Sequence, residues 1–524
     1  MKKIIALLLC ALVVLSVFAG CAAEDTPYVP TGDALAPEDA DVNATQPEEA
    51  GEPQEFSLAY YKDRSMNPTV STDYTNRTLF SLIYQGLFFV NRSNEAVPIL
   101  CKNYKFSTDY RTFTFFLMDN ATFSDGTPVT VEDVLATYTA ALKSTYYSGR
   151  FVHVKELFIS DEGGISFKLS NPITELPLLL DVPIIKAGQI EAEHPIGSGP
   201  YIFEDSLTGA HLRRNRAWWC NEMAQGFVVN AEVIPLQAAE STTQIRDGFE
   251  FSNVGVVCTD PFSDSYADYR CDRELWNIEN GLMLFIGCNV AYSEVFKDKE
   301  FRAALTYAID RETLAADHYR GFAQVTTIAC SPSSPYYSPA LAAKYKYDPV
   351  RFIEALGRIK MPKEPVELLV NKDDSLRLRA ARDIAQMLTE CGLQTVTVEV
   401  ETNKYLSNIR AGKYDLYLGQ TRLSTNMDLT PFFHPYGNMS RNGMADADIY
   451  ALCLDALENS GNFYNLHKAV ADDGCIVPIL FGSYAVYATR GLVTNLAPSR
   501  DCVFFYTLGR TDADAMIPIE YGKG

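Results

Sequence analysis

The stretch RTFTFFLMDNATFSDGTPVTVEDVLATY, residues 111–138, decides how the first part of this chain folds. Phe113, Phe115 and Leu117 recur with the two-residue period that is typical of a β-strand. The run SDGTP at 124–128 supplies turn residues, and Thr130 is suited to cap a helix whose first turn is acidic. We therefore predict a strand, a turn and a helix. The side of the helix that we expect to be buried carries Val134, Leu135, Tyr138 and Leu142.

A second stretch, FIGCNVAYSEVFKDKEFRAALTYAIDR at 285–311, contains an amphipathic helical pattern. Asp298 is placed to cap this helix, and Asp310 to cap the next one. The spacing i, i+3, i+4, i+7, i+8 defines one apolar face. That face consists of Phe301, Ala304, Leu305, Ala308 and Ile309.

Further along the chain, three apolar runs enclose a helical segment. VELLVN at 366–371, TVTVEV at 395–400 and YDLYLG at 414–419 are typical of strands, and residues 374–391 of a helix. Strands that alternate with helices indicate an α/β arrangement.

Five motifs, taken together and in this order, resemble one protein family. They are FSDGTPVTVEDV (123–134), PIGSGPYIFE (195–204), RNRAWW (214–219), FRAALTYAIDRETL (301–314) and YDP (347–349). The combination is similar to the bacterial extracellular solute-binding proteins of family 5, the oligopeptide-, dipeptide- and nickel-binding lipoproteins of ABC importers. The resemblance covers roughly residues 55–510.

This resemblance implies an α/β, two-lobed periplasmic-binding-protein-like fold of type II, cluster C, with an inserted subdomain in the first lobe. Lobe I is then expected to comprise 55–87, 195–280 and 478–524. The inserted subdomain would occupy 88–194, and lobe II 281–477. Crossover strands would join the lobes, which close on a ligand between them.

The N-terminus indicates export. Residues 1–21, MKKIIALLLCALVVLSVFAGC, combine two lysines with an apolar core too short to span a bilayer comfortably. The small residues before Cys21 resemble a lipobox, in which the cysteine receives diacylglycerol and a palmitate-type acyl chain; Phe18 departs from the usual aliphatic residue. An ordinary secretory signal is the alternative. Residues 22–54 are acidic, Pro-rich and without Lys or Arg, and we expect a disordered tether.

The composition of the chain argues against several classes of binding partner. The net charge is −21, which argues against nucleic acid, because nucleic-acid binding depends on basic patches. The cysteines beyond Cys21 form no C-x-x-C, and we expect several to be free buried thiols. The six histidines are scattered and the common catalytic motifs are absent. We expect no metal, no cofactor and no enzymatic activity.

The ligand contacts are predicted from the resemblance. Peptide-binding members carry Gly-Trp-x-x-Asp after a Tyr-Asp strand, and its aspartate holds the peptide α-amino group. Counting from Tyr414 here places Thr421 at the tryptophan and Ser424 at the aspartate, a departure from the family. Asp428 is a substitute carboxylate, and Arg422 instead suits an anionic ligand. For both, an ordinary loop role is the alternative. The predicted contacts in this segment are Gln420, Thr421, Arg422, Ser424 and Asp428.

A second group follows the first strand, where the family lines its cleft. It consists of Tyr60, Tyr61, Arg64 and Asn67, for which simple loop polarity is the alternative. Nickel is disfavoured because, of the predicted ligand segments, only the stretch that ends at His434 contains a histidine.

The resemblance implies a monomeric substrate-binding lipoprotein on the extracytoplasmic face of the cell membrane. It would deliver a small peptide or peptide-like solute to ABC permease and ATPase subunits. A surface solute sensor of the same fold and, less favoured, an exported hydrolase are the alternatives.

Overall fold

The structure is a computed structural model that describes residues 56–521, apart from 208, 227–230, 264, 265, 267, 494 and 510–518. The predicted signal, Cys21 and the tether lie outside the described residues. Everything below concerns the compact unit that begins at Ala50.

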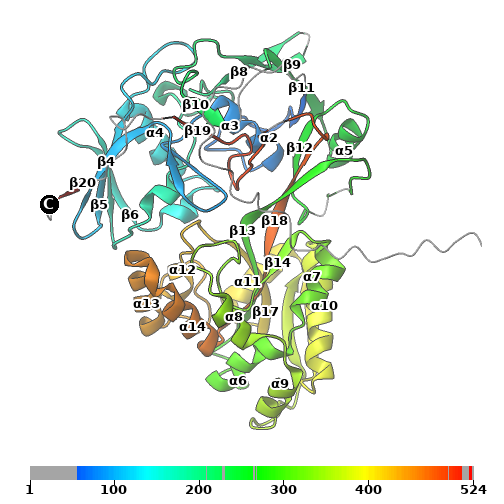
Figure 1. The fold of residues 1–524 in the computed structure, drawn as a ribbon. Coiled ribbons are helices and arrows are strands. Elements are labelled where there is room, and N and C mark those ends of the chain that lie inside the picture. The colour runs from blue at the N-terminus through cyan, green and yellow to red at the C-terminus, as the bar shows by residue number, and fades with distance from the viewer. Residues whose placement is uncertain are drawn as a thin grey trace, which may run out of the picture. The chain divides into compact units, whose positions relative to one another are not determined.

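One large sheet runs through the described chain (Figure 1). Its strand order is β16-β15-β17-β13-β18-β12-β1-β11-β9-β8, with β14 also paired to β18. The strands are β1 (Leu58–Tyr61), β8 (Tyr201–Ser206), β9 (Gly209–Arg214), β11 (Val233–Ala239), β12 (Val256–Thr259), β13 (Glu274–Cys288), β14 (Ala323–Val325), β15 (Val366–Asn371), β16 (Thr395–Val400), β17 (Leu416–Arg422) and β18 (Ile476–Ala488).

The two long strands β13 and β18 connect the two halves of this sheet. They pair antiparallel, and Figure 1 shows them running together from the region of β12 to that of β17. All thirteen residues of β18 are buried, as expected for a strand covered on both faces. Their register breaks between Glu279 and Met283. This break lies where the strands pass from one half of the sheet to the other.

The predicted α/β segment is confirmed. β15 and β16 have the predicted bounds and pair in parallel, with α10 (Ser375–Glu390) between them in the chain. The third strand, β17, pairs in parallel with β15 but begins two residues later than predicted and extends to Arg422. Its extension is held by antiparallel pairing with β13. A sequence window around 414–419 does not contain that partner.

The helix predicted after Asp298 is confirmed at its start and differs at its end. Asp298 caps α6 (Lys299–Ala304), and Asp310 caps α7 (Arg311–Tyr319). Between them the chain tightens into a 3-10 turn, η4 (Leu305–Ala308). The α-helix stops early because the Asp310 cap needs extended backbone, which the chain already adopts at Ile309. All five predicted apolar residues of this face are buried.

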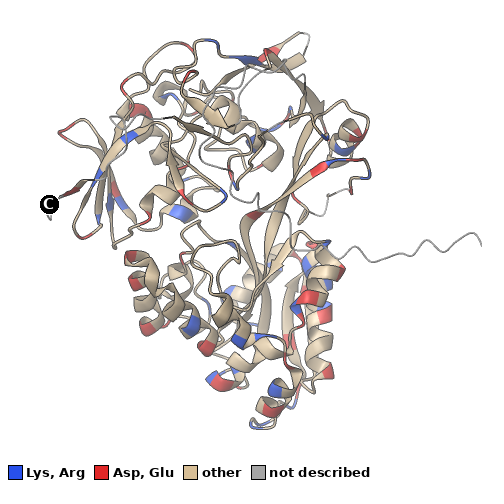
Figure 2. Ribbon diagram, in the orientation of Figure 1, with Lys and Arg blue, Asp and Glu red and all other residues tan. Residues whose placement is uncertain are grey.

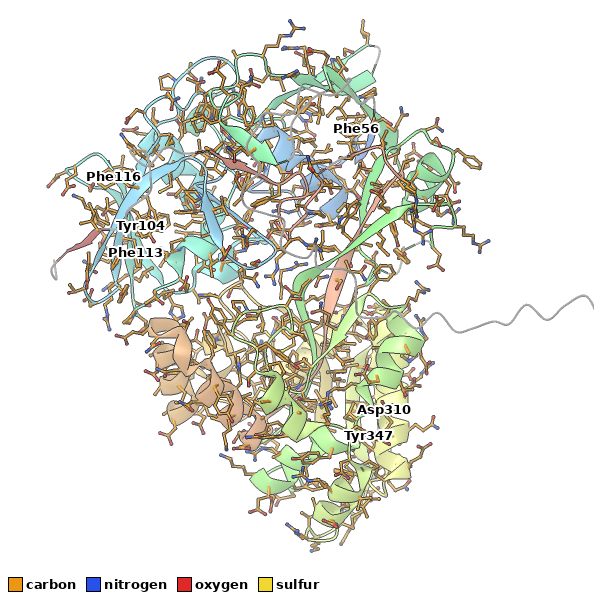
Figure 3. The ribbon with its side chains drawn as sticks, in the orientation of Figure 1. Phe56, Tyr104, Phe113, Phe116, Asp310 and Tyr347 are labelled. Carbon is orange, nitrogen blue, oxygen red and sulfur yellow. The ribbon has the colours of Figure 1, made fainter. Side chains whose placement is uncertain are left out.

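A second sheet has the strand order β20-β4-β5-β7-β6. Its strand β5 is the strand of the predicted strand-turn-helix unit, and α4 (Val131–Ala141) is the helix that follows. Thr130 and Asp133 form a reciprocal capping box at the start of α4. Of the predicted stripe, Val134 and Tyr138 are fully buried, and Leu135 and Leu142 partly. Tyr104 and Phe113 pack across neighbouring strands, 6.3 Å between ring centroids (Figure 3). The strands are β4 (Cys101–Ser107), β5 (Thr112–Leu117), β6 (Val154–Ile159), β7 (Ile165–Leu169) and β20 (Ile519–Tyr521).

The remaining elements are short strands and covering helices. Two small sheets pair β2 (Phe88–Val90) with β3 (Ala96–Pro98) and β10 (Ala224–Gly226) with β19 (Tyr506–Leu508). The helices are α2 (Tyr74–Thr78), α3 (Phe80–Ile83), α5 (Thr242–Glu250), α8 (Pro339–Ala342), α9 (Pro349–Leu356), α11 (Thr402–Ala411), α12 (Thr430–Phe433), α13 (Ala447–Glu458) and α14 (Phe463–Asp473), and the 3-10 turns η1 (Ser148–Phe151), η2 (Leu176–Leu179), η3 (Ala187–Gln189), η5 (Ala343–Tyr345) and η6 (Ser460–Asn462).

Charged side chains gather on the outer helices. Figure 2 shows many charged residues on helices such as α10, α13 and α14.

The ten cysteines of the described chain are free thiols and eight of them are buried, which confirms the predicted free buried thiols. Within the described residues, no helix is both long enough and apolar enough to cross a bilayer. The predicted lobe bounds stay a prediction.

Candidate functional site

The extension of β17 brings the predicted ligand segment to the register break of β13. Arg422 ends β17 opposite Leu282, and the backbone N–H of Leu423 donates to the carbonyl of Gly281 at 2.9 Å. Gly281 adopts a φ of 78°, a left-handed conformation that favours glycine. A Cβ there would lie 2.7 Å from the Leu423 carbonyl oxygen. A glycine is therefore required where the two segments meet.

A cavity of about 290 Å³ opens beside this junction. Four of the predicted contacts line it: Thr421, Arg422, Ser424 and Asp428. The other lining residues are Thr145, Tyr146, Gly149, Arg150, Leu423, Pro431, Phe432, Asn438, Met439 and Arg500. The site thus joins three segments, around 145–150, 421–439 and 500, that are far apart in the sequence.

Arg422 is held in place by neutral groups. Its Nη1 donates to the carbonyl oxygen of Asn280 at 2.5 Å, and its Nη2 donates to the Tyr484 hydroxyl at 2.6 Å. The guanidinium also lies 5.6 Å from the centre of the Tyr146 ring. Within the described chain no carboxylate reaches it at ion-pair distance.

The lining residue Arg150 belongs to a buried network of matched charges. Arg150 donates to Asp181 and to Asp501, each at 2.5 Å, and all three side chains are less than a tenth exposed. The Tyr146 hydroxyl donates to the same Asp501 at 2.5 Å. Burial alone raises the pKa of Asp501, but Arg150 and Arg77 hold it well below its usual range. This carboxylate stays ionised and its oxygens are occupied by the protein.

Asp428 is also occupied. Its Oδ2 lies 3.1 Å from Nε2 of His153, and its Oδ1 accepts from the backbone N–H of Thr430 at 2.8 Å. The amide of Asn171 donates to Nδ1 of His153, so the imidazole proton lies on Nε2 and is donated toward Asp428. Asp428 therefore joins the segment before β6 to the segment before α12.

The remaining predicted contacts do not line this cavity. Tyr60 and Tyr61 are buried in β1, and the Asn67 amide donates to the carbonyls of Ile190 and Ala192, both at 2.8 Å. Arg64 stacks over the Tyr61 ring and pairs with Asp73. Gln420 lies one residue before the lining segment. A ligand role for these five residues stays a prediction.

Tyr146, Arg150 and Arg500 were not predicted from the sequence. Arg500 donates to Glu279 at 2.6 Å and to the Leu423 carbonyl at 3.0 Å, and so connects the C-terminal segment to β13 and to the loop after β17. No local pattern marks these residues, because their partners lie 31 to 355 residues away.

A second cavity, of about 450 Å³, lies beside α7 and includes Asp310 and Tyr347 (Figure 3). It also includes Arg311, whose guanidinium donates to the carbonyls of Pro478, Thr306 and Ile309 and to the Thr306 hydroxyl. Four donated hydrogen bonds account for most of this side chain, so its role is structural. In the described residues no three His, Cys, Asp or Glu side chains gather as a metal site.

The architecture is that of known solute-binding proteins. The ABC transporter substrate binding protein CtaP of Listeria monocytogenes superposes with a TM-score of 0.69 at 18% identity, over 88% of this chain and 100% of that one. A peptide binding protein AppA of Clostridium difficile superposes with a TM-score of 0.70 at 16% identity, over 87% of this chain and 100% of that one. The fold is thus the two-lobed type II fold of periplasmic solute-binding proteins, which confirms the predicted fold class.

The sequence comparisons identify the family. Residues 95–443 match the family described as bacterial extracellular solute-binding proteins, family 5 Middle, and the chain belongs to this family. The oligopeptide-binding protein AppA of Bacillus subtilis is 23% identical over 481 residues, 83% of each chain. The nickel-binding periplasmic protein of Escherichia coli is 25% identical over 321 residues, 57% of this chain and 60% of that one. These relatives are solute-binding proteins rather than enzymes.

Proposed function

We propose that the protein is the substrate-binding lipoprotein of an ABC importer and captures a small peptide or peptide-like solute. The observation that carries this proposal is the polar cavity at the strand crossing, where Arg422 keeps unused hydrogen-bond donors. Family membership and the peptide-binding relatives support it. The protein itself makes and breaks no covalent bond in this proposal.

Capture follows from a shift between open and closed forms. The lobes proposed are 55–87 with 195–280 and 478–524, an inserted subdomain at 88–194, and 281–477. A ligand that contacts both lobes stabilises the closed form by its additional contacts there. The register break at Asn280 and Gly281, opposite Gly482, is the proposed hinge because the pairing of β13 with β18 is interrupted there. The closed form would then dock on permease subunits.

The first experiment is native mass spectrometry of the freshly purified protein, followed by thermal denaturation with a dipeptide and tripeptide library. We expect either a retained peptide-like ligand or a rise in melting temperature with particular peptides, because a ligand that binds only the folded state stabilises it. Amino acids and simple sugars serve as controls. No retained ligand together with an unchanged melting temperature across the library would overturn peptide capture.

The membrane anchor is tested separately. We propose that Cys21 carries the lipid and that the acidic segment 22–54 separates the folded body from the extracytoplasmic face of the membrane. Metabolic labelling with a palmitate analogue should label the membrane-bound protein, and Cys21→Ser should abolish labelling and release the protein. Equal labelling of the variant would contradict the anchor without affecting the ligand proposal.

A further inference from the structure

Three arginines line the candidate cavity and a fourth, Arg77, lies over the ring of Tyr146; one of the four differs from the others. Arg150 pairs with two aspartates at 2.5 Å, Arg500 pairs with Glu279 at 2.6 Å, and Arg77 lies 3.8 Å from Asp501. Arg422 has no carboxylate at ion-pair distance among the described residues. The cavity wall therefore contains one guanidinium whose charge the protein leaves uncompensated at close range.

The hydrogen bonds of Arg422 leave room for a ligand. A guanidinium has five N–H donors, and two of them are used, by the Asn280 carbonyl and the Tyr484 hydroxyl. Both acceptors are neutral, so they orient the group without neutralising it. An uncompensated cation away from water is costly unless an anion meets it, and the planar guanidinium matches a carboxylate in two-point geometry.

The nearby carboxylates lie beyond ion-pair distance of Arg422 or are bound elsewhere. Asp501 attracts Arg422 from a distance, but its oxygens are held by Arg150 and the Tyr146 hydroxyl. Asp428 is the carboxylate among the cavity-lining residues, and it is bound by His153 and Thr430. Asp260 follows β12, next to the Thr259–Ala485 pair, and lies beyond ion-pair distance of Arg422. Its Oδ1 accepts from the Phe262 backbone at 3.0 Å. The lining residues thus offer an unused cation and no unused anion.

The position where relatives hold an amine is also unsuited to that role. The hydroxyl of Ser424 is hydrogen-bonded to the Asn426 side chain at 2.7 Å. A neutral, already bonded hydroxyl gives an ammonium group much less than a carboxylate does. The volume of about 290 Å³ lies just below the range of roughly 300–1,000 Å³ for small-molecule sites, so the ligand should be small.

From these observations we infer that the cavity recognises its ligand by a free carboxylate, which Arg422 binds through two hydrogen bonds. The cavity makes no specific contact with the ligand's amine. This inference rests on the proposed function and narrows its substrate class to small peptide-like solutes with a free carboxylate. N-acylated peptides and N-acyl amino acids belong to that class, whereas peptide amides do not.

The test uses three matched forms of a set of alanine- and glycine-containing dipeptides: free, N-acetylated, and C-terminally amidated. Binding to the full chain is measured by calorimetry and by melting temperature. We expect the free and N-acetylated forms to bind within about threefold of each other and the amides at least 100-fold more weakly. Amides that bind as well as acids, or a strict need for the free amine, would overturn the inference and leave peptide capture intact. Failure of all three forms would overturn both.

Variants separate recognition from folding. Arg422→Met should lower the affinity for the N-acetylated forms about 100-fold and bring acid and amide to equal affinity. Arg422→Lys keeps the charge but loses the planar guanidinium. This variant should bind the N-acetylated forms about tenfold more weakly and still prefer acids over amides. Arg216→Met, at a side chain 80% exposed, is the control and should bind as the wild type does. An Arg422→Met protein that still prefers acids over amides would show that Arg422 does not bind the ligand's carboxylate.

Discussion

Arg150 and Arg422 line the same cavity and each lies 5.6 Å from the Tyr146 ring centre, yet their surroundings differ. Arg150 is enclosed by two aspartates, whereas Arg422 contacts a carbonyl and a hydroxyl. A matched charge fixes the fold of the segments that carry it. An unmatched charge at a cavity is available to a ligand. The difference between the two arginines thus distinguishes structure from recognition.

The largest expected effect comes from breaking the matched side. Asp501→Asn removes a charge that Arg150 and the Tyr146 hydroxyl share and leaves the arginine with Asp181 alone. Removing one partner of a buried ion pair costs about 3–5 kcal/mol. We expect a loss of this size in the free energy of unfolding, measured by urea denaturation.

Arg422→Met is the matched control for this comparison. Because it breaks two hydrogen bonds but no close ion pair, it should lower the free energy of unfolding by less, about 1–2 kcal/mol. Equal losses for the two variants would show that Arg150 and Arg422 do not differ in the way that their contacts indicate.

His467 sharpens the comparison because it is a buried basic group that can lose its proton. Both ring nitrogens are buried without a hydrogen-bond partner in the described chain, and burial lowers the pKa of His467 to about 4. The unfolded chain, with a pKa near 6.5, takes up the proton first as the pH falls. The stabilisation is complete above pH 6.5 and is lost progressively toward pH 4, on the order of 3 kcal/mol.

The measurement is urea denaturation of the wild type and His467→Leu at several values between pH 7 and pH 4. The wild type should lose stability more steeply over this window than the variant. Parallel curves would mean that the histidine titrates alike in the folded and unfolded chains. Arg422 cannot become neutral in this way, because a guanidinium keeps its proton throughout this pH range.

The sequence predicted local structure well and the site only in part. Caps such as Thr130, Asp298 and Asp310, and the strands 366–371 and 395–400, follow from residues a few positions apart, and the structure confirms them. Arg422 was reached through the position of a strand in a known family. Tyr146 and Arg500 were missed because their partners, Asp501 and Glu279, lie hundreds of residues away and follow no period.

A smaller effect is expected at Gly281, where β13 meets the loop after β17. Gly281→Ala places a Cβ 2.7 Å from the Leu423 carbonyl and 2.8 Å from the Arg500 guanidinium, at a φ that alanine disfavours. We expect a loss of about 2 kcal/mol in the free energy of unfolding. Because Leu423 follows Arg422 directly, ligand affinity should fall as well. An unchanged affinity would place the hinge elsewhere along β13.

The smallest effect tests whether stability and recognition separate. Thr130 caps α4, and its hydroxyl and the Asp133 carboxylate satisfy each other's backbone donors. Thr130→Ala should cost about 1 kcal/mol, because it removes one capping bond and leaves the buried side of the helix unchanged. Tyr146 follows α4 by five residues but is held by Asp501, so its position should survive. The variant should therefore unfold at lower urea and yet bind ligand as the wild type does. A loss of affinity in Thr130→Ala would show that this wall of the cavity depends on the helix cap and not on the buried ion pairs.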